Sequence, residues 1–89
     1  MKPIQFRSHA QKQLKERNIA EDLVKDVLRH PGQIVESYKD RKIAQDIVKY
    51  KGEEFLIRVV YAERSDVVEI VTVYLTKKIK KYWEEKDAH

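Results

Sequence analysis

The stretch FLIRVVYAERSDVVEIVTVYLT, residues 55–76, constrains the fold more than any other part of the chain. Two runs rich in Val, Ile, Phe and Tyr flank a polar break at residues 63–66. Runs of this composition, bounded by turn residues, indicate paired strands. Both faces of the pair are largely apolar, so we expect the hairpin to lie inside a sheet. On the second strand, strict alternation places Val68, Ile70 and Tyr74 on one face.

Arg58 fits this stretch least well, because it lies in the middle of an apolar strand. A buried guanidinium without a partner is costly, so Arg58 requires one. The sequence offers two solutions, Glu69 on the neighbouring strand or a ligand, and both stay open at this stage.

The remaining elements follow from changes in hydrophobic period. Apolar residues at helical spacing predict two helices, and Asn18 between them either ends the first in a left-handed turn or caps the second. The expected bounds are 3–7 for a short strand, 8–17 and 19–30 for helices, 34–38 and 43–50 for strands, and 77–86 for a last helix. The predicted fold is α+β: a short N-terminal strand, two helices, a four-strand antiparallel meander and a C-terminal helix, with the helices on one side of the sheet.

Composition places the chain among small globular proteins. Its 89 residues predict a single domain, 1–89, and 42% hydrophobic residues are too many for a disordered chain. The absence of cysteine excludes disulfides and thiolate metal sites. The sequence contains neither a secretory signal nor an apolar run of about 20 residues, so we expect a cytoplasmic protein with no membrane partner. A net charge of +4 favours polyanions or an acidic protein partner.

Several catalytic classes lack their characteristic residues in this sequence. The histidines His9, His30 and His89 have no second ligand at helical spacing, so no metal site is predicted. The chain has only two glycines, Gly32 and Gly52, which leaves no phosphate-binding loop. We therefore expect neither a metal nor another cofactor.

Three side chains besides Arg58 are candidates for chemistry. His9 opens the first helix, where a neutral imidazole can accept a proton from a hydroxyl; the alternative is a histidine that only occupies a helix start. Arg17 lies about two turns later and could fork onto a phosphate, or else interact with the helix C-terminus. Tyr74 brings a phenol to the end of a central strand, where most tyrosines are core residues with a hydrogen-bonded hydroxyl.

A basic run precedes Tyr82 and Trp83 near the C-terminus. Basic side chains with nearby aromatics suit single-stranded RNA, through phosphate contact and base stacking. The alternative is a solvated helix face anchored by a core tryptophan. The candidate RNA-binding residues are Lys77, Lys78, Lys80 and Lys81.

The segment FRSHAQKQLKERNIAEDLVKDVLRHPGQI, with the strands ending in VTVYLT, resembles a family of small bacterial proteins of unassigned function. The pattern of that family is a His opening a helix, an Arg before a short turn, a second helix ending near Pro, and a closing strand ending in Thr-x-Tyr. The resemblance covers residues 4–76, and the matching residues are His9, Arg17, Pro31, Thr72 and Tyr74. Asn18 and Ala20 depart from the Gly turn and the Ser or Thr cap typical of the family.

That family is similar to the RelE/ParE-like and BrnT-like toxins. The resemblance implies a RelE-like fold and a metal-independent endoribonuclease of a toxin–antitoxin pair, with RNA or the ribosome and an antitoxin as partners. It also implies roles for His9 as base or acid, for Arg17 and Arg58 as phosphate clamps, and for Tyr74 as a positioning or proton-donating group. Two alternatives remain: a non-catalytic module that binds RNA or an antitoxin, and a ParE-like gyrase inhibitor. The sequence does not predict the oligomeric state.

Overall fold

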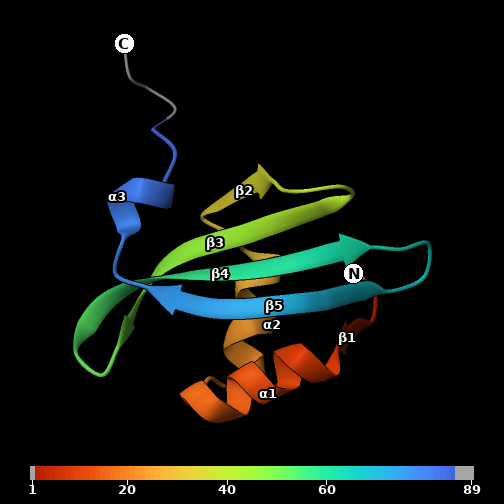
Figure 1. The fold of residues 1–89 in the computed structure, drawn as a ribbon, viewed down its shortest axis with the longest axis horizontal. Coiled ribbons are helices and arrows are strands. Elements are labelled where there is room, and N and C mark those ends of the chain that lie inside the picture. Colours follow the sequence, from red (N-terminus) through yellow and green to blue (C-terminus); the bar gives the residue numbers. More distant parts are fainter. Residues whose placement is uncertain (1, 86–89) are drawn as a thin grey trace.

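The computed structural model describes residues 2–85, which form a five-stranded sheet and three helices (Figure 1). The order of the elements matches the prediction, and the α+β class is confirmed. None of the helices within residues 2–85 has the length and apolar character needed to traverse a bilayer. In chain order the elements are β1 (Ile4–Phe6), α1 (Ser8–Arg17), α2 (Glu21–Arg29), β2 (Gln33–Glu36), β3 (Arg41–Tyr50), β4 (Glu53–Glu63), β5 (Val68–Thr76) and α3 (Ile79–Tyr82).

The sheet is mixed, with the strand order β1-β5-β4-β3-β2. Antiparallel pairing joins β2 to β3, β3 to β4 and β4 to β5, so β4 and β5 are interior strands, as predicted. β1 departs from the predicted antiparallel sheet, because Ile4 to Phe6 pair in parallel with Val68 to Ile70. A strand of three residues carries too short a pattern to reveal which distant strand it joins.

The main core lies between one face of the sheet and the helices α1 and α2 (Figure 1). Leu14 of α1 and Val24 of α2 belong to one buried cluster with Ile57 and Val59 of β4. Asn18 ends α1 in the left-handed conformation, with φ of 55°, and backbone N–H groups there donate to the last carbonyls of the helix. The first of the two roles predicted for Asn18 is therefore the one observed.

Helix α3 lies on the opposite face of the sheet from α1 and α2. Side chains alternate between the faces of a strand. Val59 faces the core, whereas its neighbour Arg58 contacts Tyr82 of α3. The prediction that all helices pack on one side is thus wrong for α3. The helix is also a single turn of four residues, much shorter than the expected 77–86; residue 86 and His89 lie outside the described residues.

A β-bulge interrupts the pairing of β4 with β5 between Val60 and Tyr61. Thr72 pairs with Val60 and Ile70 pairs with Tyr61, so β5 carries one extra residue at this point. As a result Ile70 faces the core. Strict alternation predicted that Ile70 would share a face with Tyr74, which points to the opposite side, toward Arg58.

Candidate anion-binding site on the sheet

Four polar side chains lie in register across four adjacent strands, on the sheet face opposite α1 and α2. Gln33 of β2 pairs with Gln45 of β3, which pairs with Arg58 of β4, which pairs with Tyr74 of β5. Gln33, Gln45 and Arg58 are all buried, with Gln45 fully inaccessible. We call Gln33, Gln45, Arg58 and Tyr74 the polar row.

Arg58 is the centre of the polar row. Its Nε donates to Oε1 of Gln45 at 2.9 Å, and its Nη1 donates to the hydroxyl of Tyr74 at 2.7 Å. The ring of Tyr82 from α3 stacks on the guanidinium, with its centroid 4.2 Å from Cζ. These contacts hold the guanidinium in one orientation but supply no negative charge.

Arg58 has no acidic partner within residues 2–85. The pairing with Glu69 that the sequence left open is not formed, because Glu69 accepts instead from Arg7 at 2.8 Å and from Arg64 at 3.4 Å. Nη2 of Arg58 donates no hydrogen bond within the described residues, which hold no fully buried side-chain nitrogen or oxygen without a partner. Nη2 therefore has no acceptor among residues 2–85. A positive side chain that is only 7% exposed and lacks a counter-ion is a site suited to an anion.

Gln45 orients the arginine, and both glutamines hold the stretch around Tyr82 and Glu84. Oε1 of Gln45 accepts from Nε of Arg58, and Nε2 of Gln45 donates to Oε1 of Gln33 at 2.9 Å and to the carbonyl of Tyr82 at 3.1 Å. Gln33 in turn bonds both the backbone N–H and the carbonyl of Glu84. Neither glutamine is among the residues predicted from the sequence, although Gln45, like Arg58, is a polar residue in a strand-like run.

His9 and Arg17 do not join this site. Both side chains are exposed on α1, which packs on the other face of the sheet. Among residues 2–85 no hydrogen bond or ion pair links either side chain to Arg58 or Tyr74. Arg17 contributes its backbone carbonyl, which accepts from the hydroxyl of Tyr50 at 2.6 Å. The structure thus brings together two of the four predicted catalytic residues and leaves the other two apart from them.

The four predicted RNA-binding lysines lie between the end of β5 and the end of α3. All four are exposed. Lys77 forms an ion pair with Glu53 at 2.6 Å, and Nζ of Lys81 lies 5.3 Å from the ring centroid of Tyr82. Lys78 and Lys80 form no ion pair within the described residues. Lys81 therefore adds exposed positive charge beside the ring that stacks on Arg58.

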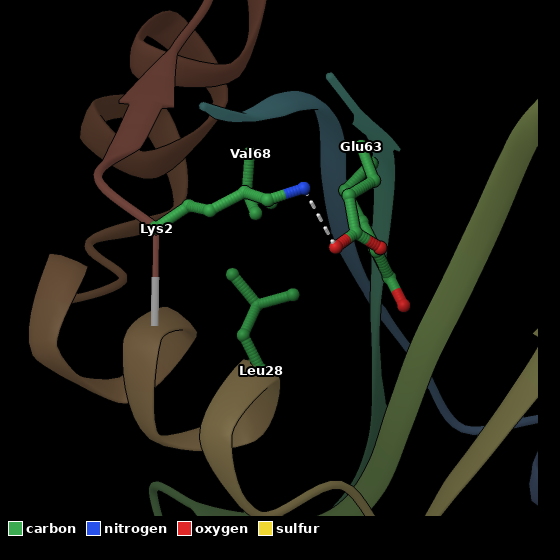
Figure 2. Close-up of a pocket in the computed structure, with 5 residues that line it drawn as sticks. Lys2, Leu28, Glu63 and Val68 are labelled. Atoms are coloured by element: carbon green, nitrogen blue, oxygen red, sulfur yellow. Dashed lines mark hydrogen bonds and ion pairs between the residues drawn. The ribbon is translucent and has the colours of Figure 1, made fainter. Parts of the chain in front are cut away.

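A cavity of about 370 Å³ lies at the other end of the sheet, on the core side (Figure 2). Its lining includes Leu28, Val68 and Tyr61, and Lys2 reaches across it to form an ion pair with Glu63 at 3.2 Å. Burial raises the pKa of Tyr61. The cavity contains none of the predicted site residues, and the charges at its rim already neutralise each other.

The structure shows no metal centre in its described part: within residues 2–85 no group of three or more His, Cys, Asp or Glu side chains is arranged to hold an ion.

Glu69 offers a test of the electrostatics on the polar-row face. Hydrogen bonding to Arg7, with a further contribution from Arg64, lowers the pKa of Glu69 below its ordinary value of 4.5. A carboxyl group with a lowered pKa stabilises the fold at neutral pH, and this stabilisation disappears as the pH falls through the lowered value. We therefore expect Glu69→Gln to destabilise the protein most at pH 7, and progressively less as the pH falls below 4.5 and through the lowered pKa. Urea unfolding over a series of pH values from 7 downward measures this, with exposed Glu16→Gln as control; a loss that does not shrink as the pH falls would contradict the assignment.

The fold and site together define a small α+β protein with a buried arginine that has no acidic partner among residues 2–85. Residues 6–75 match the family described as "Domain of unknown function (DUF4258)", and the chain belongs to this family. The match spans β1 to β5 and includes Arg58 and Tyr74, whereas the lysine run and α3 follow it. Comparisons with curated proteins and with solved structures find no significant match.

Proposed function

We propose that this protein binds single-stranded RNA, with a phosphodiester held by Arg58 and Tyr74. The observation that carries the proposal is the burial of Arg58 without a carboxylate partner among residues 2–85. Burying a charge is costly, and a chain that retains such a residue in its central strand needs a compensating anion. A phosphate supplies that charge and accepts from both Nη2 of Arg58 and the phenol O–H of Tyr74.

The exposed lysines support a polyanion in preference to a small anion. Lys78, Lys80 and Lys81 are exposed on the stretch that leads from β5 to Tyr82, whose ring stacks on Arg58. Contacts of lysine with successive phosphates give affinity without sequence selectivity, and such affinity falls as salt rises. A single strand fits because its phosphates can follow a short, irregular path over one sheet face.

The wider class we propose is a RelE-like, toxin-like protein with an antitoxin as second partner. Support comes from the element order, a strand and two helices followed by antiparallel strands, together with the family resemblance in residues 4–76. Within that class, a ParE-like inhibitor of gyrase would act without RNA. The uncompensated arginine favours the RNA-binding member of the class.

RNA cleavage without metal is the second candidate. Tyr74 accepts a hydrogen bond from Arg58, so its own O–H is left to donate to a leaving 5′-oxygen as the 2′-oxygen attacks phosphorus. That reaction also needs an acceptor for the 2′-hydroxyl proton. The described residues in contact with Arg58 are Gln45, Tyr74 and Tyr82, and none is a strong base. Binding therefore ranks above cleavage.

Binding of a labelled oligouridine, followed by fluorescence anisotropy in EDTA, tests the proposal. Arg58→Lys keeps the charge but loses the planar fork, and we expect about tenfold weaker binding. Tyr74→Phe removes one donor and should weaken binding about threefold. Lys12→Ala, which removes a positive charge from the far helix α1, and His9→Ala should leave affinity unchanged.

The same samples distinguish the two candidates. If Arg58→Lys binds RNA as tightly as the unaltered protein, the proposed site is wrong. RNA recovered intact supports binding without cleavage, whereas cleavage in EDTA that disappears in Tyr74→Phe would establish the second candidate.

A further inference from the structure

Residues 79–85, which we call the C-terminal segment, lie over the polar row. In Figure 1 the helix of this segment, α3, stands apart from α1 and α2 at one end of the sheet. The segment follows Lys77 and Lys78, which come directly after β5, and it contacts Gln33, Gln45 and Arg58. It therefore occupies the surface on which a ligand of Arg58 would lie.

The sheet holds this segment chiefly through its backbone. Nε2 of Gln33 donates to the carbonyl of Glu84 at 2.6 Å, and Oε1 of Gln33 accepts from the N–H of Glu84 at 3.0 Å. Nε2 of Gln45 donates to the carbonyl of Tyr82. The indole of Trp83 lies against Gly32, where a Cβ would come within 2.9 Å of it. The three hydrogen bonds go to backbone groups, so they form whatever side chains the segment carries.

The segment has little structure of its own to keep it in place. α3 is one turn, and an isolated turn of helix is not stable in water. Lys78, which precedes it, has φ −82° and ψ 59°, outside helix and strand geometry. The position of the segment over the polar row, which we call the closed position, thus depends on contacts with Gln33 and Gln45, on the Trp83 indole and on the stack of Tyr82 on Arg58. Each of these contacts contributes only a modest free energy.

The stack of Tyr82 on Arg58 is the arrangement that a nucleobase would adopt. A guanidinium offers a flat face to an aromatic ring and its edge to a phosphate. In the structure Tyr82 covers that face, with its ring centroid 4.2 Å from Cζ, while Nη2 at the edge has no acceptor among the described residues.

We propose that the C-terminal segment is a displaceable cover, and that a base of single-stranded RNA replaces Tyr82 on Arg58 when RNA binds. This inference rests on the proposed function and adds the class of ligand: an unpaired base joined to a phosphate. Bases within a duplex are stacked on their neighbours and are not free to take that place. Binding by the closed protein is weakened by the energy required to displace Tyr82.

Trp83 reports on the cover directly, because it is the only tryptophan in the chain. Titration with unlabelled oligouridine should shift its emission to longer wavelength as the indole leaves Gly32 for water. Tyr82→Ala removes the competing ring and should bind labelled oligouridine about threefold to fivefold tighter. Gln33→Ala, which loosens the segment without touching Arg58, should act in the same direction. Tyr82→Phe keeps the ring and is the matched control, with unchanged affinity.

The outcomes distinguish the proposal that the C-terminal segment is a displaceable cover from the proposal that Arg58 and Tyr74 bind RNA. Binding that leaves Trp83 emission unchanged, or that weakens in Tyr82→Ala, overturns the cover while the proposed function stands. Tighter binding in Tyr82→Ala and Gln33→Ala, with red-shifted emission in the bound protein, supports it. Failure of the unaltered protein and of Tyr82→Ala alike to bind oligouridine overturns both proposals. Duplex RNA that binds Tyr82→Ala as tightly as oligouridine overturns the assignment of an unpaired base.

Discussion

Ile57→Ala is expected to lower the free energy of unfolding by about 3–4 kcal/mol. Ile57 is fully inaccessible in the middle of β4, within the cluster that joins α1 and α2 to the sheet. Truncation removes the transfer free energy of the lost methyl groups and leaves a cavity that β4, paired on both sides, cannot close. A domain of this length has about 5–10 kcal/mol in total, so the variant would melt at least about 12 °C lower.

Ile47→Ala provides the matched control for this prediction. Ile47 lies on the neighbouring strand β3 but is 39% exposed, so the same truncation should cost below about 1 kcal/mol. Urea and thermal unfolding, followed by circular dichroism, measure both variants. Equal losses would contradict the placement of the core on the face that carries Ile57.

The hairpin at the centre of the sheet could be predicted because its composition and its polar break are local signals. β4 and β5 both lie within a residue or two of the predicted runs, and both are interior. The bulge opposite Val60 and Tyr61 could not be predicted. Both faces of β5 are apolar there, so the break in alternation that puts Val73 and Ile70 on the same face leaves no trace in the hydrophobic pattern.

Arg58 could be recognised as unusual from the sequence, but its surroundings could not. A charged residue in an apolar strand demands a partner wherever the strand lies. Strand register decides which residues become the partners of Arg58. Gln45 and Tyr74 lie beside it because the register of β3 and β5 on β4 pairs both of them with Arg58. Glu69 has the right charge to pair with Arg58, but it lies near the start of β5, where it forms an ion pair with Arg7.

The separation of His9 from Arg58 shows the limit of reading a site from a motif. His9 and Arg17 share one helix, so their relation to each other follows from helical spacing. Their relation to Arg58 depends on which face of the sheet α1 covers. The family match includes all three residues, yet α1 packs on the core face and Arg58 points the other way.

Gln45→Leu is expected to destabilise the protein by about 3–4 kcal/mol, as much as a large core truncation. The leucine has a similar size but leaves Nε of Arg58 without its acceptor, and it leaves Tyr82 without the donor to its carbonyl. Loss of a hydrogen-bond partner costs most when the group left behind is charged and buried. Gln11→Leu, an identical change at an exposed position of α1, should alter stability by less than about 0.5 kcal/mol.

Most of that loss should disappear when the charge is removed as well. In Gln45→Leu/Arg58→Met the buried pair becomes apolar, and replacing a buried polar pair by apolar side chains of similar volume is often close to neutral. We expect the double variant to be about 2 kcal/mol more stable than Gln45→Leu alone, as measured by urea unfolding. Arg58→Met, measured in the same way, completes the cycle and gives the coupling energy of the pair. If the losses of the two single variants simply add up in the double variant, Gln45 and Arg58 do not stabilise each other. A double variant that is stable but no longer binds RNA would show that Arg58 is required for binding and is not required for folding.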